Sequence, residues 1–171
     1  MNLHVTTPSA ASSLQPGLRE WLSSKRLLLI GGKWVAAQSG KTFDVTDPAT
    51  GEVIAKVAEG DKADVDAAVK AARKAFESGP WPKMTPSARG RLLHKIGDLI
   101  LEHADELAAL EAIDNGKPKH VAKAADVTLS ADMFHYMSGW ATKIEGKQIS
   151  ISALAAPGSD FFSVTRPEPI G

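Results

Sequence analysis

The strongest constraint on the fold is a long stretch of helical apolar periodicity that ends abruptly. Between residues 92 and 113, apolar residues recur at spacings of three and four, which predicts one long amphipathic helix. Thr85 followed by a proline predicts its start. The Asn-Gly-Lys-Pro sequence at 115–118 predicts its end, because Asn-Gly supplies a left-handed conformation and the proline prevents the helix from resuming. A second long helix is expected over residues 119–144.

Asp114 places a carboxylate at the end of the first of these helices. A helix C-terminus already carries partial negative charge and favours a cation. One interpretation is that the carboxylate is exposed or bonds the turn that follows. The other is that it meets a cation or a neighbouring backbone, and the surrounding residues leave both open.

Short strands and one further helix precede these two helices. Residues 27–35 predict a hairpin with Gly31-Gly32 in its turn, and 42–57 predict two strands around an Asp-Pro-Ala-Thr-Gly turn. Asp61 with Asp64 three residues later resembles a capping box and predicts a helix start. The chain is therefore expected to be an α/β protein.

Each predicted helix carries an apolar stripe, and the simplest interpretation is that each stripe faces a hydrophobic core. The stripe of the helix after Asp61 consists of Val65, Val69, Ala72 and Phe76. The stripe of the last helix consists of Ala125, Leu129, Met133, Tyr136, Trp140 and Ile144.

Charge and apolar patterning exclude several classes of function. Basic and acidic residues balance at 20 each, so no basic excess favours nucleic acid or an anionic membrane. No apolar run approaches the roughly 20 residues of a spanning helix, and no secretory signal is recognisable. We expect a cytoplasmic protein with no nucleic-acid or membrane partner. Residues 1–26 are expected to form a mobile N-terminal extension with a short helix around Leu14 to Leu22.

The pattern changes after Gly146. Residues 148–152 alternate with period two, a loop follows, and 161–166 are again β-like, which predicts a two-stranded ribbon. A lone ribbon is marginal in water. Exposing its large apolar residues forgoes roughly 1.5–3 kcal/mol each. The ribbon is therefore expected to pair with something else, most simply another subunit.

No catalytic motif is recognisable. Ser-Gly-Lys-Thr at 39–42 imitates the end of a phosphate-binding loop, but a valine stands where its first glycine should be. No Gly-x-Gly-x-x-Gly motif occurs. The five histidines include no i, i+3 or i, i+4 pair, so each is interpreted as an ordinary surface or core residue. Cysteine is absent, which excludes disulfides, thiolate metal sites and cysteine nucleophiles.

The ordered motifs nevertheless resemble the N-terminal third of the NAD(P)-dependent aldehyde dehydrogenase superfamily. The resemblance begins at about residue 27 and runs to the last residue, with motifs in family order. The residues that carry it are 30–34, 42–43, 47–54, 57–60, 64–69, 89–93, 110–118, 136–140 and 165–171.

The resemblance implies a domain organisation. Residues 27–146 would be the hairpins and helices that open the cofactor-binding domain, and 147–166 would be a ribbon of the oligomerisation domain. Residues 167–171 would start the first cofactor-binding strand, before the Rossmann-like sheet. The ribbon would join a homodimer or homotetramer.

The resemblance also implies site residues. Asp114 would be the acidic ligand of a monovalent-cation site, K⁺ or Na⁺, together with the backbone carbonyls of Val45 and Thr46. Leu129 and Met133 would line the substrate tunnel.

In this family a cysteine thiolate attacks the aldehyde, hydride passes to NAD or NADP, and a glutamate activates water to release the acid. This chain lacks cysteine, and the other catalytic groups lie further on in family members. No catalytic or cofactor-binding residue is therefore assigned, and the chain alone is expected to be inactive although its parent would oxidise an aldehyde. The alternative is a stand-alone interaction or regulatory module that assembles with full-length family members.

Overall fold

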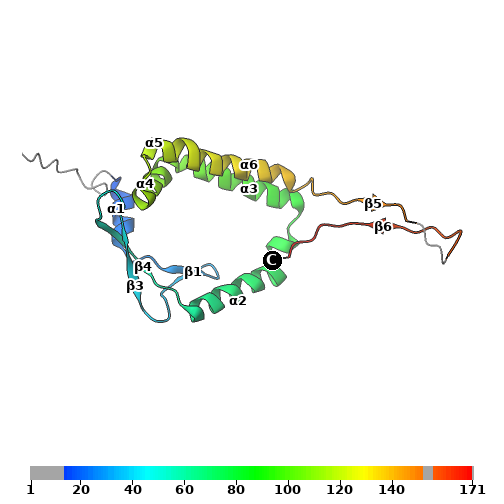
Figure 1. Ribbon diagram of the computed structural model, residues 1–171, viewed down its shortest axis with the longest axis horizontal. Coiled ribbons are helices and arrows are strands. Elements are labelled where there is room, and N and C mark those ends of the chain that lie inside the picture. Colours follow the sequence, from blue (N-terminus) through cyan, green and yellow to red (C-terminus); the bar gives the residue numbers. More distant parts are fainter. Residues whose placement is uncertain (1–13, 152–155, 171) are drawn as a thin grey trace, which may run out of the picture.

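The computed structural model describes residues 14–151 and 156–170 (Figure 1). These residues form helices and three two-stranded antiparallel sheets, an α/β arrangement. The strands are β1 (Leu28–Ile30), β2 (Lys33–Val35), β3 (Thr42–Thr46), β4 (Val53–Ala58), β5 (Gln148–Ile149) and β6 (Ser163–Val164). The helices are α1 (Pro16–Ser23), α2 (Lys62–Ser78), a 3₁₀ helix (Trp81–Lys83), α3 (Pro86–Glu102), α4 (Ala104–Asn115), α5 (Lys119–Val121), a π-helical segment (Ala122–Val127) and α6 (Thr128–Trp140). The predictions for residues 1–13, 152–155 and 171 fall outside the described residues.

The two N-terminal hairpins confirm the prediction from turn chemistry. β1 pairs with β2, and Gly31 and Gly32 in their turn have φ of 60° and 77°. β3 pairs with β4, with Phe43 opposite Val57. The register shifts between Val45 and Thr46, where a bulge begins the Asp-Pro turn.

The short helix expected near the N-terminus forms α1 and packs on β4. Leu14, Leu18 and Leu22 are buried with Ala55 of β4 and with Ala109 and Ile113 of α4, and together they form one hydrophobic cluster. The spacing of the three leucines puts them on one helical face. This cluster joins the second hairpin to α4.

The predicted capping box at the start of α2 is confirmed. The Asp61 carboxylate accepts from the N–H of Ala63 at 2.9 Å, and the Asp64 carboxylate accepts from the N–H of Asp61 at 3.0 Å. Asp64 also accepts from the N–H of Gln38 at 3.0 Å, which ties α2 to the loop before β3. These donors, Asp61 first, hold the pKa of the Asp64 carboxyl below its ordinary value despite the burial that raises it.

The prediction of one long helix up to residue 114 is wrong. The helix breaks at His103, where ψ is 18°, and this break divides it into α3 and α4. Asp105 and Glu106 lie in the first turn of α4, where the helix dipole favours acidic side chains. The predicted end of the helix is confirmed: Gly116 has φ of 78° and donates its N–H to Ala112 at 3.0 Å.

The last helix also differs from the prediction in two ways. It passes through the π-helical segment before α6, and the Thr128 hydroxyl donates to the carbonyl of Lys123, five residues back, at 2.9 Å. It ends at Trp140 instead of Ile144, in a turn where the N–H of Lys143 donates to the Trp140 carbonyl at 2.9 Å. Apolar spacing alone indicates neither feature.

Two buried glycines let α3 and α6 pack closely as an antiparallel pair. A Cβ at Gly90 would lie 2.8 Å from the carbonyl oxygen of Ser138, and a Cβ at Gly97 would lie 3.0 Å from that of Ala131. The two contacts are seven residues apart on each helix, which is two helical turns. The close approach therefore runs along both helices.

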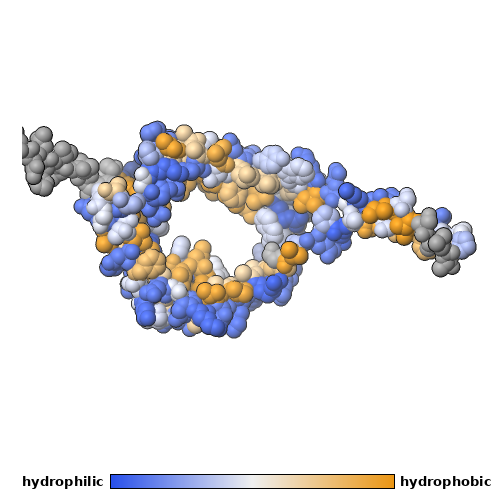
Figure 2. Space-filling model, in the orientation of Figure 1, coloured by the Kyte–Doolittle hydropathy of each residue, from blue (hydrophilic) through white to orange (hydrophobic). Residues whose placement is uncertain are grey.

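The apolar stripes of α2 and α6 are not covered by the described residues, and the stripe of α3 and α4 is covered only in part, contrary to the expectation that each faces a core. On α2, Val65 and Val69 are 58% and 60% exposed, and on α6, Tyr136 is 62% exposed. Figure 2 shows that the molecule surrounds an opening whose rim carries much hydrophobic surface. Periodicity predicts that a face is covered, but not that the cover lies in the same residues. None of the described helices is both long and apolar enough to cross a bilayer.

Candidate functional site

A groove of about 640 Å³ lies where α1, β4, α4 and α6 meet. Its lining is mainly apolar and includes Leu110 of α4 and Phe134 of α6. Three carboxylates also line it, those of Glu111, Asp114 and Asp126. Such a combination of apolar walls and a few polar groups is typical of a binding site.

The structure brings two of the three predicted cation ligands to this groove. Asp114 is exposed on the last turn of α4, and Val45 of β3 is half-buried; both line the groove. Thr46 ends β3 and is exposed, outside the lining. Among the described residues no protein group bonds the Asp114 carboxylate, and Asn115 closes the turn instead, accepting from the N–H of Lys117 at 2.9 Å.

The turn after β3 holds these elements together. The Asp47 carboxylate is 1% exposed and accepts from the N–H of Ala49 at 2.8 Å, and its other oxygen has no partner among the described residues. The Pro48 ring lies against Gly116, where a Cβ would come within 3.1 Å of Cγ. Turn chemistry predicted the Asp-Pro turn, but the contact that places it beside the end of α4 is between residues far apart in sequence.

The two predicted tunnel residues lie one turn apart on α6. Leu129 is 63% exposed and Met133 is 56% exposed. Their neighbours Ser130 and Phe134 line the groove, whereas Leu129 and Met133 do not. The structure therefore presents both predicted residues on a free apolar face beside the groove.

The predicted ribbon is present as β5 and β6, which extend away from the helices (Figure 1). Lys147 and Thr165 close its base, with the Thr165 N–H donating to the Lys147 carbonyl at 2.8 Å. The large apolar side chains of the ribbon are exposed in the structure: Ile149, Ile151, Phe161, Phe162 and Val164.

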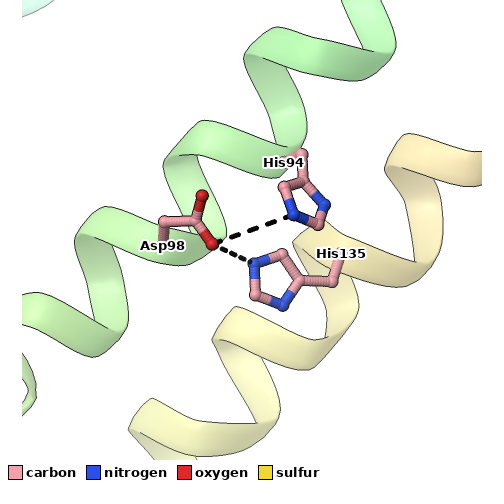
Figure 3. Close-up of side chains that lie close together, drawn as sticks. All are labelled: His94, Asp98 and His135. Carbon is pink, nitrogen blue, oxygen red and sulfur yellow. Dashed lines mark hydrogen bonds and ion pairs between the residues drawn. The ribbon is translucent and has the colours of Figure 1, made fainter.

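A cluster of ionisable side chains between α3 and α6 was missed from the sequence. His94 and Asp98 of α3 and His135 of α6 point toward one another (Figure 3). Nε2 of His135 lies 3.0 Å from Oδ1 of Asp98, and Nε2 of His94 lies 3.9 Å from the same oxygen. The sequence signal for this cluster is the i, i+4 spacing of His94 and Asp98, which places both side chains on one face of a helix. Spacings between two histidines do not reveal it, because the third member is an aspartate.

Comparison with known proteins gives a consistent result. The model of the Aldehyde dehydrogenase family matches residues 34–171. The chain is 50% identical over 145 residues to aldehyde dehydrogenase family 2 member B4, mitochondrial, from Arabidopsis thaliana, with 84% of this chain and 26% of that protein covered. It is also 50% identical over 145 residues to the mitochondrial aldehyde dehydrogenase of Homo sapiens, with 84% of this chain and 27% of that protein covered.

Solved structures are similar over the same part of the chain. The NAD⁺ complex of an aldehyde dehydrogenase from Bacillus cereus superposes with a TM-score of 0.78 at 49% identity, over 81% of this chain and 28% of that one. The chain thus spans between a quarter and a third of the length of these relatives. The cytoplasmic location expected from the sequence stays a prediction, because relatives named as mitochondrial are among the matches.

Proposed function

The chain belongs to the aldehyde dehydrogenase family, and from that premise we propose that it corresponds to the N-terminal portion of an enzyme that oxidises an aldehyde to a carboxylic acid with NAD or NADP. The observation that carries the proposal is the family match over residues 34–171, which begins in β2 and runs through the ribbon to the last residue of the chain. The Bacillus cereus relative was solved with NAD⁺, which supports a dinucleotide cofactor for the parent enzyme.

The uncovered apolar faces support this proposal. Val69 of α2 and Tyr136 of α6 are more than half exposed, and leaving large apolar side chains in water forgoes roughly 1.5–3 kcal/mol each. A parallel sheet of a cofactor-binding domain would be flanked by helices on both faces. We propose that α2 and α6 present these faces to such a sheet in the parent enzyme.

The residues described here do not themselves fit a dinucleotide. A pyrophosphate is usually held where a glycine-rich turn leads from a strand into a helix. The long helices begin instead after Asp61 and Thr85, each of which caps its helix with its own side chain. We therefore propose that most of the NAD or NADP site is formed by other parts of the parent enzyme.

We propose that the chain alone has no aldehyde dehydrogenase activity, because it contains no cysteine to attack the aldehyde. The test is aldehyde-dependent reduction of NAD and NADP by the purified 171-residue protein, with an intact family member as the positive control. No signal above the enzyme-free background is expected. Turnover by the purified chain would contradict the proposal.

We propose further that the ribbon, residues 147–166, joins subunits by extending a sheet of a neighbouring protomer into a homodimer or homotetramer. Phe162 is 73% exposed and Val164 is 58% exposed, and β5 and β6 each have one unpaired edge among the described residues. In the parent enzyme, Phe162→Ser should lower the mass measured by size-exclusion chromatography with light scattering. Leu29→Ser is the matched control, since Leu29 is 59% exposed on β1, away from the ribbon.

The exposed edges of the ribbon also favour a second function, an interaction module that assembles with full-length family members. Mixing the purified chain with an intact family member separates the two proposals. Stoichiometric co-elution would support the module, and separate elution would favour a portion of one enzyme.

We propose that Asp114 and the carbonyls of Val45 and Thr46 hold K⁺ or Na⁺ in the parent enzyme. The support is that Asp114 and Val45 line one groove and that Asp114 has no protein partner among the described residues. Thermal melts of the parent in K⁺, Na⁺ and a bulky organic cation test this, with Asp114→Ala beside wild type. The small cations should raise the melting temperature of wild type only, and equal melting in all three salts would refute the site.

We propose that Leu129 and Met133 contribute to the substrate tunnel of the parent enzyme. Both lie on the free face of α6, beside the groove. Leu129→Ala should raise KM for a bulky apolar aldehyde more than KM for a small one, because it removes apolar contact area from the larger substrate. Equal effects on both substrates would contradict this role.

A further inference from the structure

The His94, Asp98 and His135 cluster offers three ligand atoms from two helices. One carboxylate oxygen and one atom of each imidazole all lie within 4.8 Å of one another. Two of the separations are 3.0 Å and 3.9 Å. Ligand atoms at 2.0–2.1 Å from a tetrahedral metal are roughly 3.3–3.4 Å apart. Small rotations of these side chains would therefore bring them to metal-binding distances.

The packing of the two helices holds His135 in place. Its side chain is only 26% exposed, and a Cβ at Gly97 would lie 2.4 Å from its Cδ2 and 2.5 Å from its Nε2. The imidazole thus lies directly across the backbone of α3, next to Asp98. The ring of His94 is 4.4 Å from that of His135 between centroids, at an interplanar angle of 32°.

The chemistry of the three groups selects a class of metal. Neutral imidazole suits Zn²⁺, Ni²⁺ and Cu²⁺, whereas Ca²⁺ and Mg²⁺ require mostly oxygen ligands. Two histidines and one carboxylate leave a fourth tetrahedral position for water. His94 and Asp98 are 58% and 60% exposed, so water and metal can reach the cluster.

We propose that His94, Asp98 and His135 form a binding site for a first-row divalent transition metal, with Zn²⁺ as the reference ion. The metal would bridge α3 and α6 across the line of contact made by Gly90 and Gly97. The site lies between two helices outside the groove and requires no aldehyde chemistry, so its test is independent of the proposed function.

The alternative is that the cluster is an ordinary hydrogen bond between His135 and Asp98. Another histidine of the chain provides the comparison. Nδ1 of His103 lies 3.4 Å from Oε2 of Glu106, and this pair offers two ligand atoms instead of three. Among the described residues, the cluster is the one group of three histidine and acidic side chains that could hold a metal. His103→Asn is therefore the matched control for the cluster variants.

The experiment is isothermal titration calorimetry of Zn²⁺ into the purified protein, prepared without a polyhistidine tag in a weakly coordinating buffer at neutral pH. Wild type should bind one Zn²⁺ per chain. His94→Asn and His135→Asn should each weaken binding at least about 10-fold to 100-fold, because loss of a direct ligand should cost at least as much as loss of its supporting partner. His103→Asn should bind as wild type does.

Circular dichroism checks that each variant keeps the helical content of wild type. Co²⁺ provides a second readout, since ligation by the cluster should produce visible absorption bands in wild type that disappear in His135→Asn. Absence of stoichiometric Zn²⁺ binding by folded wild type would overturn the proposal. Equal loss of binding in His103→Asn and His94→Asn would overturn it as well.

Discussion

Replacing Gly90 with alanine tests the close packing of α3 against α6, which places both the histidine cluster and the apolar face of α6. The added Cβ would lie 2.8 Å from the carbonyl oxygen of Ser138 and 3.5 Å from the Cβ of Ala141. The first distance is shorter than any ordinary carbon–oxygen contact, and the oxygen belongs to a helix backbone. The two helices must therefore move apart to accept the methyl group.

The magnitude follows from two opposing effects. Alanine is a better helix former than glycine by about 0.8–1 kcal/mol. Overpacking of a close contact typically costs about 1–3 kcal/mol. Gly90→Ala should therefore lower the free energy of unfolding by up to about 2 kcal/mol.

Gly139→Ala on α6 is the matched control. The nearest atom to a Cβ there is Nζ of Lys143 at 3.4 Å, at the end of a flexible side chain. This substitution should raise the free energy of unfolding by about 0.4–1 kcal/mol. Together the two ranges make the variants differ by about 0.4–3 kcal/mol, with most of the difference coming from the overpacking at Gly90.

Urea unfolding of the purified protein, followed by circular dichroism, measures both values. If Gly90→Ala stabilises the protein as much as Gly139→Ala does, only helix propensity is acting. The two helices would then not approach each other as the structure describes, and the placement of His135 across α3 would lose its basis.

Substitutions at three further positions test other parts of the structure. The pKa of Asp64 is lowered in the folded state, so its carboxylate stabilises the fold at neutral pH. This contribution is lost as the pH falls through the folded pKa. Urea unfolding midpoints measured at decreasing pH should therefore fall more steeply for wild type than for Asp64→Asn. Gly116→Ala should cost about 1–2 kcal/mol in urea unfolding, because φ is 78° and Pro48 lies against it, whereas Gly116→Asn should cost less. Gly97→Ala keeps all three cluster ligands but displaces His135, so calorimetry should show weaker Zn²⁺ binding than in wild type.

Local signals predicted most of the elements. The glycine pair at 31–32 specified the first hairpin, the Asp61 capping box specified the start of α2, and Gly116 specified the end of α4. Each of these features depends on the conformation or side chain of residues within a few positions of one another. Such interactions can be read from sequence because no distant contact is needed to satisfy them.

Features that depend on distant contacts were not predictable in the same way. The cluster of His94, Asp98 and His135 forms because Gly90 and Gly97 allow α6 to lie close to α3. The periodicity of each helix indicates which face is apolar, but not which partner it meets or how closely. The i, i+4 spacing of His94 and Asp98 is visible in the sequence, but it indicates a three-ligand cluster only once the structure places His135 of α6 beside them.

The apolar stripes of α2 and α6 that stay exposed bear on the proposed function in the same way. Where a stripe met a partner within the described residues, as Leu18 and Leu22 of α1 meet Ala55 of β4, it became a buried core. Where it did not, as for Val65 and Val69 of α2, it stayed more than half exposed although its pattern is as regular. The apolar periodicity of a helix therefore predicts that one face is covered, whether or not the described residues provide the cover. If the chain is a portion of an aldehyde dehydrogenase, as proposed, the exposed faces of α2 and α6 are where the rest of that enzyme should make contact.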